Sequence, residues 1–600
     1  MCGIYGYFDR SGRSLSSGAL AAMDASLVHR GPDDTGVHAV RGAAVANRRL
    51  SVIDPAGGHQ PFVSADGRIA LVQNGEIFNH VELRAQLQRD GVAFASDHSD
   101  TEVLLRLYER HGMDFLPRLN GMFAIAVLDR RDPEAPVLHL ARDRIGVKPL
   151  FVHDDGARVL FGSEIKALLP ALGAAPTLHL PALQHFLAYN YVPPPETMFA
   201  GVRHVPPGCM LRIDRHGSRL QRWWSLAAQQ PVAQEFGAWR DEFLALYDDA
   251  VRLRLRADVP FGAFLSGGVD SSSVVALMAR HQTAPVRTFC IGFDDPRFDE
   301  SPYAREAARR FGTLHRERVV APDLLDEWAD ALWHCDQPHG DASFLPTLEV
   351  ARLAAAEVTV VLTGDGGDEL FAGYDKYAAF AADPQLLALP DAAFARRYVE
   401  HTGLFGAAAR EQLLQPWLRQ RLHDVDSVAD VAQPWFDEVR HFDRVNQMLY
   451  LDMMLLLPGN NLVKPDRMGM AVSLEARTPL LDWRIMEFAF RAPGATKLHG
   501  GDKKHWFKRA VEPLIGHDLA HRRKQMFTVP IGEWFRGARK VWLHELLFAP
   551  DALAARLFDA DALRGLFDAH VAGTANHTRE LRALAAIELW ARRFQPEIAT

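Results

Sequence analysis

The chain has 600 residues, which are too many for one hydrophobic core, so two or three domains are expected. With 48% hydrophobic and 24% charged residues it has the composition of a globular protein, and its net charge of −8 argues against a nucleic-acid partner, which would need a basic surface. No apolar run approaches the ~20 residues of a membrane span, and the N-terminus lacks a signal-peptide pattern. We therefore expect a cytoplasmic protein without a membrane partner.

The first 170 residues alternate between short apolar runs and helical patterns. The turn-forming pairs Asp66-Gly67 and Asn74-Gly75 are predicted to separate some of the strands. Strands are predicted at Ile4–Phe8, Ala43–Ala46, Ile69–Gln73, Met122–Leu128, Val137–Ala141 and Val159–Gly162, and helices at Gly18–Leu27, His80–Asp90 and Glu102–His111. Strands in succession with helices between them indicate a layered α+β domain.

Proline-rich stretches at Val192–Pro195 and Val205–Gly208 interrupt this pattern. They indicate that the region from 180 to 225 is the tail of the first domain and the connection to the next. The expected domains are therefore 1–220 and 221–600.

Strands and helices alternate from about residue 236 onward. Strands are predicted at Phe261–Leu265, Val286–Gly292 and Val358–Thr363, and helices at Trp239–Arg256, Ser272–Arg280 and Tyr303–Phe311. This alternation predicts an α/β domain with a parallel, doubly wound sheet, in which ligands bind at the carboxyl ends of the strands. The last 140 residues are predicted to be mainly helical.

A glycine-rich loop, SGGVDSS at Ser266 to Ser272, follows one of these strands. Gly267 and Gly268 allow N–H groups to face inward, and Ser271 stands near a helix start, which favours phosphate. Asp270 is an acid inside this anion site, so we expect it to hold Mg²⁺ between itself and the phosphates. The run resembles the pyrophosphate loop of ATP pyrophosphatases and lacks the GxxxxGK[ST] pattern of the other common phosphate loop.

A second acidic glycine loop, TGDGGDE at Thr363 to Glu369, follows the strand predicted at Val358–Thr363. Asp365 and Asp368 lie among its three glycines. In isolation such a loop is a solvated turn, but its position at the end of a strand favours a metal or substrate role.

Cys2 is the second informative feature, because removal of Met1 would make it the N-terminal residue. Its α-amine, with a pKa of about 7.7–8.0, is then partly neutral and can act as base for the thiol of the same residue. The other cysteines, Cys209, Cys290 and Cys335, form no CxxC pair, and the 26 histidines show no HExxH spacing, so reduced thiols and ordinary histidines are expected.

Polar residues suited to glutamine lie downstream of Cys2. Arg49 is a candidate partner for a substrate carboxylate, and the Asn74 side chain with the Gly75 N–H is a candidate oxyanion hole. Glu76 and Asp100 are candidates for holding a substrate ammonium.

Matching runs along nearly the whole chain resemble the glutamine-hydrolysing asparagine synthetases. They are MCGI, HRGPDD, RRLSVID, NGEIFN, SDTE, GMFAIAVLD, RDRIGVKPL, SEIKAL, SGGVDSS, GDGGDELFAGY, DRMGMAVSLEARTPLLD and RKQMFTVPIGEWF. The resemblance implies an N-terminal-nucleophile (Ntn) glutaminase domain joined to an ATP pyrophosphatase-like synthetase domain. It also implies a carbon–nitrogen ligase that uses glutamine, ATP with Mg²⁺, and aspartate, with a homodimer as a possible assembly.

The resemblance further implies a role for each matching residue. Cys2 would form a glutamyl thioester, and Arg49, Asn74, Gly75, Glu76 and Asp100 would bind glutamine in a pocket shaped by Leu50 and Ile53. In the second domain Ser266, Gly267, Gly268, Asp270 and Ser271 would hold pyrophosphate. Asp270 and Asp368 would bind Mg²⁺, and Leu265, Ile291, Thr363 and Gly364 would contact the adenylate. Ammonia would pass internally to the acyl-adenylate.

Three positions depart from the family pattern or leave it open. Some relatives carry Glu in place of Asp365, where a carboxylate assists adenylate chemistry. Lys504 best matches a lysine that steadies adenylation, but the adjacent Lys503 remains an alternative. Met526 stands where the family usually has Gly.

Three hypotheses follow. The first is conversion of L-aspartate to L-asparagine, and the second is the same machinery acting on another carboxylate, such as a uronic-acid sugar, a peptide or a secondary metabolite. The third is a degenerate binding protein, which the intact Cys2, Asn74, Asp270 and Asp368 argue against.

Overall fold

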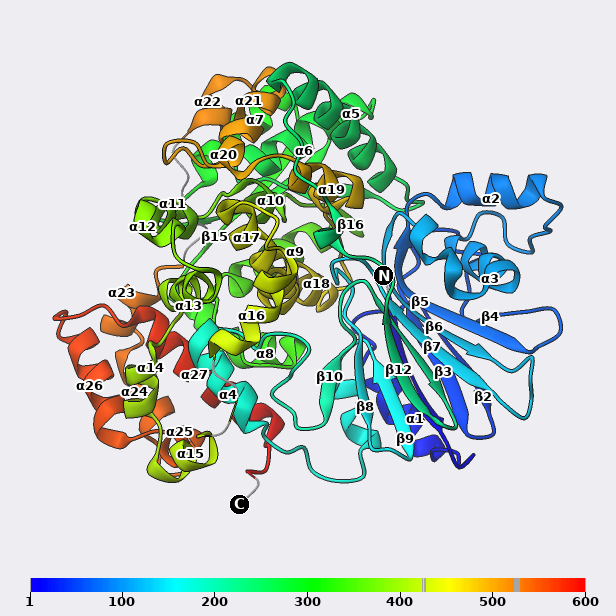
Figure 1. The fold of residues 1–600 in the computed structure, drawn as a ribbon, viewed down its shortest axis with the longest axis horizontal. Coiled ribbons are helices and arrows are strands. Elements are labelled where there is room, and N and C mark those ends of the chain that lie inside the picture. Colours follow the sequence, from blue (N-terminus) through cyan, green and yellow to red (C-terminus); the bar gives the residue numbers. More distant parts are fainter. Residues whose placement is uncertain (1, 424, 426–427, 523–528, 599–600) are drawn as a thin grey trace.

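The N-terminal half of the chain forms two six-stranded antiparallel sheets that lie face to face (Figure 1). The computed structural model describes residues 2–423, 425, 428–522 and 529–598. The first sheet has the order β10–β8–β9–β1–β3–β2 and the second β12–β11–β7–β6–β5–β4. Their strands are β1 Cys2–Asp9, β2 Asp34–Val40, β3 Ala43–Arg49, β4 Phe62–Val63, β5 Ile69–Ile77, β6 Gly121–Asp129, β7 Val137–Arg142, β8 Phe151–Asp154, β9 Arg158–Gly162, β10 Val202–His204, β11 Cys209–Asp214 and β12 Gly217–Arg222.

Helices cover the outer faces of both sheets. Apolar side chains of the two inner faces, such as Ile4 and Val72, share one core. Helices α2 (His80–Arg89) and α3 (Asp100–His111) pack on the outer face of the second sheet. Helices α1 (Ser17–Ala25) and α4 (Leu180–Tyr189) share a core with the outer face of the first. Because both of its faces are covered, β1 is buried along its whole length, and the predicted layered α+β domain is confirmed.

The C-terminal half contains a five-stranded, all-parallel sheet of order β15–β14–β13–β16–β17. The strands are β13 Phe261–Phe264, β14 Arg287–Phe293, β15 Leu314–Val320, β16 Val360–Leu362 and β17 Glu475–Arg477. Alternate residues of β16 enter different cores: Val360 and Leu362 pack with one set of helices and Val361 with another. A sheet covered by helices on both faces is doubly wound, as predicted.

The helices of this half surround the sheet, and the helices nearest the C-terminus, drawn in deep orange and red, lie together at the lower left of the view (Figure 1). The first core includes α5 (Phe236–Arg254), α6 (Val269–Arg280) and α21 (His505–Ile515), and the second includes α8 (Trp328–Cys335), α9 (Phe344–Ala355) and α18 (Val463–Met470). The other helices are α7 Ser301–Phe311, α10 Gly367–Phe371, α11 Asp375–Ala381, α12 Pro384–Leu387, α13 Asp391–Thr402, α14 Ala407–Leu413, α15 Pro416–Arg421, α16 Val428–Glu438, α17 Arg444–Leu451, a π-helix Asp452–Asn461, α19 Trp483–Arg491, α20 Gly494–Lys497, α22 His517–His521, α23 Ile531–Arg536, α24 Lys540–Phe548, α25 Leu553–Leu557, α26 Ala560–Val571 and α27 Thr578–Phe594. Among the described helices none combines the length and apolar character that a membrane span requires.

Three expectations need correction. Asn74 and Gly75 are not a turn: both lie inside β5, paired with Ala124 and Phe123 of β6. The region 180–225 is the tail of the first half, as expected, but most of it is not a connection, since it contributes α4 and β10 to β12, and β11 pairs with β7 in the second sheet. Helix α6 begins at Val269, so Asp270 and Ser271 stand in its first turn. The division after residue 220 stays a prediction, and Met526 and part of the run RKQMFTVPIGEWF lie outside the described residues.

Candidate active sites

Cys2 is the first residue of β1. Two other strands, β3 and β5, bring candidate residues to this end of β1. Cys2 pairs with Arg49 of β3, and its backbone nitrogen donates to Asn74 Oδ1 of β5 over 3.2 Å. That nitrogen is the atom that becomes the α-amine when Met1 is removed. Residues that are 47 and 72 positions away in the sequence thus meet at the predicted nucleophile, the first because β1 and β3 pair and the second because the two sheets stack.

The Cys2 side chain is only 5% exposed. Burial raises the pKa of the thiol, and hydrogen bonds from the Asn47 side chain and the Leu50 backbone together with the Arg49 charge offset this only in part. Since the thiolate is the reactive form, a thiol with a raised pKa needs a base next to it. The backbone nitrogen of the same residue is in that position.

The Arg49 side chain is buried and is held by carbonyl groups rather than by an acid. Its guanidinium donates to the carbonyl oxygens of Ile53, Asp54 and Pro55 over 2.9–3.0 Å. Carbonyls fix the position of the group without neutralising its charge, so the arrangement suits a ligand carboxylate. Leu50 and Ile53 are both buried and belong to the core shared with the C-terminal half.

Gly75, Glu76 and Asp100 lie around the end of β5. A Cβ atom at Gly75 would stand 1.9 Å from the Met122 carbonyl oxygen, so the sheet requires glycine there. Burial raises the pKa of Glu76 well above its usual value, with the nearby Glu475 and Asp100 adding to the effect. The Asp100 carboxylate accepts hydrogen bonds from Gln73 Nε2 and from the Ile77 N–H, each over 3.0 Å. The structure thus brings all the predicted glutamine-binding residues into one region.

The second candidate site lies at the carboxyl ends of β13 and β16, which are neighbours in the parallel sheet. Ser266 Oγ lies 3.2 Å from Ser271 Oγ and accepts from the Gly268 N–H over 3.3 Å. Gly267 has φ +72° and passes so close to Tyr303 that a Cβ atom would meet its carbonyl carbon at 2.4 Å. The loop therefore turns sharply into α6 with its N–H groups near the helix start, the geometry that favours phosphate.

The two glycine-rich loops touch each other through Asp270. A Cβ atom on Gly364 would lie 2.7 Å from Asp270 Cβ, and one on Gly367 would lie 2.3 Å from Asp270 Oδ1. The glycines of the second loop are thus required by the close approach of the acid from the first. This contact places Asp270 beside Asp368, as the predicted metal pair demands.

Lys504 joins the two acids. Its Nζ lies 2.5 Å from Asp270 Oδ2 and 2.8 Å from Asp368 Oδ1. Burial by itself lowers the pKa of Lys504, but the two carboxylates outweigh it and raise the pKa above its usual value. Lys503 instead pairs with the exposed Asp375. The geometry favours Lys504 over Lys503 as the lysine of the site.

The carboxylates of Asp270 and Asp368 both face one cation, and this arrangement indicates whether a metal ion fits between them. Asp270 and Asp368 both reach the Lys504 ammonium group, so their oxygens already face a common positive charge. Mg²⁺ is typically held by one or two carboxylates together with substrate phosphates. The residues therefore fit such an ion.

The remaining residues predicted for this site lie on or shortly after strands of the parallel sheet. Thr363 Oγ1 donates to Asp365 Oδ2 over 2.6 Å, and burial raises the pKa of the Asp365 carboxyl. Leu265 follows β13 and its N–H donates to the Phe289 carbonyl over 2.9 Å. Ile291 lies near the carboxyl end of β14 and is buried.

Two family models match the chain. The model described as asparagine synthase matches residues 242–592, and the model described as glutamine amidotransferase domain matches residues 1–224. The chain belongs to the asparagine synthase family. It is 31% identical to glutamine-hydrolysing asparagine synthetase 1 of Bacillus subtilis (strain 168), over 100% of this chain and 98% of that one. It is 34% identical to a putative asparagine synthetase of Mycobacterium tuberculosis (strain ATCC 25618 / H37Rv), over 96% and 93%. It is also 28% identical to Amidase chyE of Penicillium rubens, over 89% of each chain.

In this member of the family a cluster of buried charges joins the two halves, and sequence reasoning missed it. Arg30 donates from Nε to the Cys2 carbonyl over 3.1 Å and from Nη1 to Asp466 Oδ2 of α18 over 3.0 Å. Lys148 also reaches Asp466, over 3.2 Å, while Arg467 pairs with Glu164 over 2.7 Å. We call these residues, with Lys166 and Asp336, the interdomain ion cluster. Arg30 stands in the matching run HRGPDD, which was the available signal.

A small cavity lies between the halves of this asparagine synthase family chain. From the first half it is lined by Arg142 and Val147, and from the second by His339, Leu462 and Asp466. Asp466 also belongs to the interdomain ion cluster, whose Arg30 touches Cys2. His339 is hydrogen-bonded to the Asp341 carbonyl, so the cavity borders residues on both sides of the interface.

Proposed function

We propose that this chain catalyses the glutamine-dependent, ATP-cleaving amidation of L-aspartate to L-asparagine through an acyl-adenylate, with AMP and pyrophosphate as the other products. One observation carries the proposal. In one part of the chain the buried Cys2 thiol lies beside its own backbone nitrogen, which is hydrogen-bonded to Asn74. In another part Lys504 bridges two acids, Asp270 and Asp368, that lie against glycines. The first arrangement suits release of ammonia, and the second suits activation of a carboxylate.

At the first site the Cys2 thiol would give its proton to its own α-amine and attack the side-chain amide of glutamine. The C–N bond then breaks as the leaving nitrogen takes that proton back from the α-ammonium group, so ammonia leaves and a glutamyl thioester remains until water hydrolyses it to glutamate. Asn74 Oδ1 holds the amine, and Arg49 would bind the glutamine carboxylate. Asn74 and the Gly75 N–H supply the donors that a negatively charged carbonyl oxygen needs.

At the second site a carboxylate oxygen of the acceptor would attack the α-phosphorus of ATP, and pyrophosphate would leave. The 266–271 loop and the first turn of α6 would bind the pyrophosphate, while Asp270 and Asp368 would hold Mg²⁺, which neutralises phosphate charge when bound. Lys504 would add a second positive charge beside the phosphates. Ammonia then attacks the acyl carbon, and AMP leaves as the amide forms.

Partly buried polar residues near Asp365 favour an amino acid as the acceptor. Lys464 Nζ lies 2.7 Å from Asp341 Oδ2 and 3.0 Å from Ser343 Oγ. Burial by itself raises the pKa of Asp341, but the charges of Lys464 and Arg582 outweigh it and hold the pKa low. Two cations and one carboxylate form a surface that complements an α-carboxylate and an α-ammonium group, which aspartate carries and a uronic-acid sugar lacks.

The cavity between the halves supports internal transfer of ammonia. It reaches from Asp466, next to the residues that contact Cys2, to His339, next to Asp341. Ammonia is mostly protonated in neutral water and then has no lone pair for attack, whereas a closed passage keeps it neutral and keeps water from the adenylate.

The alternative is the same machinery acting on another carboxylate, and the likeness to a protein named an amidase favours keeping it. Incubation of the full chain with glutamine, Mg²⁺-ATP and L-aspartate separates the two. The proposal expects asparagine, AMP and pyrophosphate in equal amounts. Active glutamine hydrolysis without asparagine would reject aspartate and leave the alternative. Absence of both half-reactions would support a binding protein.

A further inference from the structure

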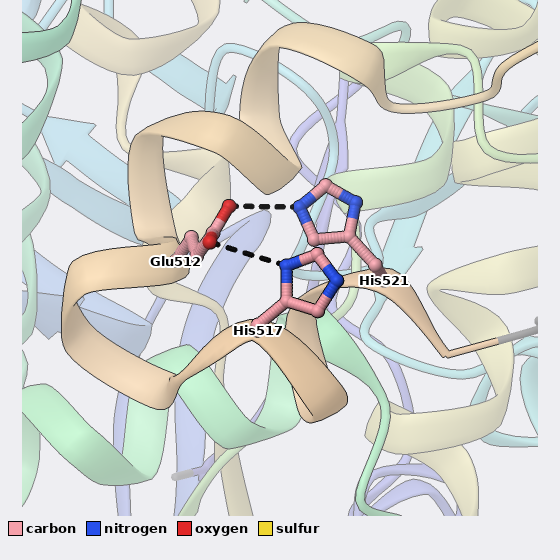
Figure 2. A group of neighbouring side chains, drawn as sticks. All are labelled: Glu512, His517 and His521. Carbon is pink, nitrogen blue, oxygen red and sulfur yellow. Dashed lines mark hydrogen bonds and ion pairs between the residues drawn. The ribbon is translucent and has the colours of Figure 1, made fainter.

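Three side chains of types that bind metal ions gather at the turn between α21 and α22 (Figure 2), and none of them belongs to either candidate site. Glu512 Oε1 lies 3.2 Å from His517 Nδ1, and Glu512 Oε2 lies 2.9 Å from His521 Nε2. The two imidazole rings stack with their centroids 4.6 Å apart. All three donor atoms lie within 4.8 Å of one another, and this is the only such group among the residues that the structure describes.

The fold of the turn produces this group. His517 and His521 are four residues apart on α22, so they share one face of the helix. Gly516, with φ +84°, lets the chain fold back so that this face meets Glu512 of α21. The spacing, Glu-x4-His-x3-His across two helices, differs from HExxH, which is why the sequence predicted only ordinary histidines.

The donor set defines the class of ion. Imidazole nitrogen and carboxylate oxygen are the usual ligands of Zn²⁺, and three protein ligands leave a fourth tetrahedral position for water. Donor atoms around such an ion lie about 3.3 Å apart, given metal–ligand bonds of about 2.0–2.1 Å. The two contacts of Glu512, with His517 and His521, are close to that spacing, so binding requires only small rotations of side chains. The His517 side chain is 71% exposed, which leaves the group open to ions in solution.

We propose that Glu512, His517 and His521 bind a Zn²⁺-class divalent ion that holds α22 against α21. The consequence of this site follows from the next residue. Arg522 donates from Nε to the Gly267 carbonyl over 2.9 Å and from Nη2 to Glu300 Oε1 over 2.7 Å. Its guanidinium also lies over the Tyr303 ring, with 4.3 Å to the ring centroid. An ion that fixes α22 therefore also fixes the side chain that supports the SGGVDSS loop.

The direct test is titration of the metal-free full chain with Co²⁺, monitored by its visible absorption, followed by displacement with Zn²⁺. Wild type should bind one equivalent of Co²⁺ at this site. The affinity for that equivalent should be at least about 100-fold lower in H517A/H521A. Asp518→Asn is the matched control, because Asp518 is an exposed acid on α22 outside the group. It should bind like wild type.

Equal stoichiometry and affinity in wild type and H517A/H521A would overturn the proposal. If the double variant melts early without metal, Glu512→Gln serves instead, since it keeps both imidazoles and removes only the charged ligand. Its affinity for Co²⁺ should fall at least about tenfold, and an unchanged affinity would equally refute the site.

The link to the loop has a separate readout that rests on the proposed function. Zn²⁺ loading should lower the KM for ATP in aspartate-dependent ATP–pyrophosphate exchange about twofold in wild type and leave H517A/H521A unchanged. An identical KM with and without the ion would refute the link. Failure of the exchange reaction itself would count against the proposed function, while the Co²⁺ titration still decides the metal site.

Discussion

Replacement of Lys504 by Met removes a positive charge that contacts both Asp270 and Asp368. The two contacts, 2.5 and 2.8 Å long, join a buried lysine to two partly exposed carboxylates, so the cost of about 3–5 kcal/mol for breaking a fully buried ion pair is an upper bound. Mg²⁺-ATP would restore part of this charge balance, so the folding cost should shrink when nucleotide is present. For catalysis, loss of one positioned donor lowers turnover by about 10²–10³-fold.

The assay is ATP–pyrophosphate exchange in the presence of aspartate, with glutamine hydrolysis measured in parallel as a check of folding. K504M should lose exchange by about 10²–10³-fold and keep its glutaminase rate. Lys503→Met is the matched control, because Lys503 pairs with the exposed Asp375, and such a surface pair contributes about 0–1 kcal/mol. Retained exchange in K504M, or equal losses in K503M and K504M, would refute the assignment.

Four further changes test separate parts of the molecule. Cys2→Ala should abolish glutamine-dependent synthesis but spare synthesis from added ammonium chloride; loss of both would contradict two sites in series. Arg49→Ala should raise the glutamine KM at least about tenfold in a glutamate-release assay, and an unchanged KM would count against carboxylate binding. Asp270→Asn should suppress pyrophosphate release with either nitrogen source, which a retained rate would disprove. Burial lowers the pKa of Lys497 to about 7, below its ordinary 10.5, so the unfolded chain binds more protons between these values and stability should rise with pH through that window. Denaturation at pH 7 and 9 should show that rise in wild type and not in Lys497→Met, which should also be more stable at pH 7.

Local patterns in the sequence predict the helices and strands of each layer better than they predict which strands pair with one another. The strand–loop–helix alternation places β13, α6 and β16 correctly because each element is set by residues near it in sequence. Asn74-Gly75 shows the opposite case. By local preference the pair forms a turn, yet in the structure it continues β5 because β6 supplies the partners and the Met122 carbonyl excludes any side chain at Gly75.

The same distinction separates the candidate residues that were predicted from those that were missed. Asp270 and Asp368 stand in the first turns of α6 and α10, shortly after glycines that are visible in the sequence, and the close approach of Asp270 to Gly364 and Gly367 explains the glycines of the second segment. Arg30 and Asp466 are 436 residues apart, and nothing in either segment predicts that they meet. Buried ion pairs of this kind depend on how two domains dock, which local patterns do not record.

The interdomain ion cluster also bears on how the two candidate sites would act together in the proposed reaction. Arg30, Lys148, Lys166 and Glu164 come from the first half of the chain, and Asp336, Asp466 and Arg467 come from the second. Separating the halves would leave buried charges without their partners, which is strongly destabilising. The docked arrangement is therefore the stable one, and in it the residue that contacts the Cys2 carbonyl is bonded to Asp466 at the edge of the cavity. In the proposed reaction ammonia must remain neutral on its way to the adenylate, and an interface held together by buried ion pairs would keep water away from that passage.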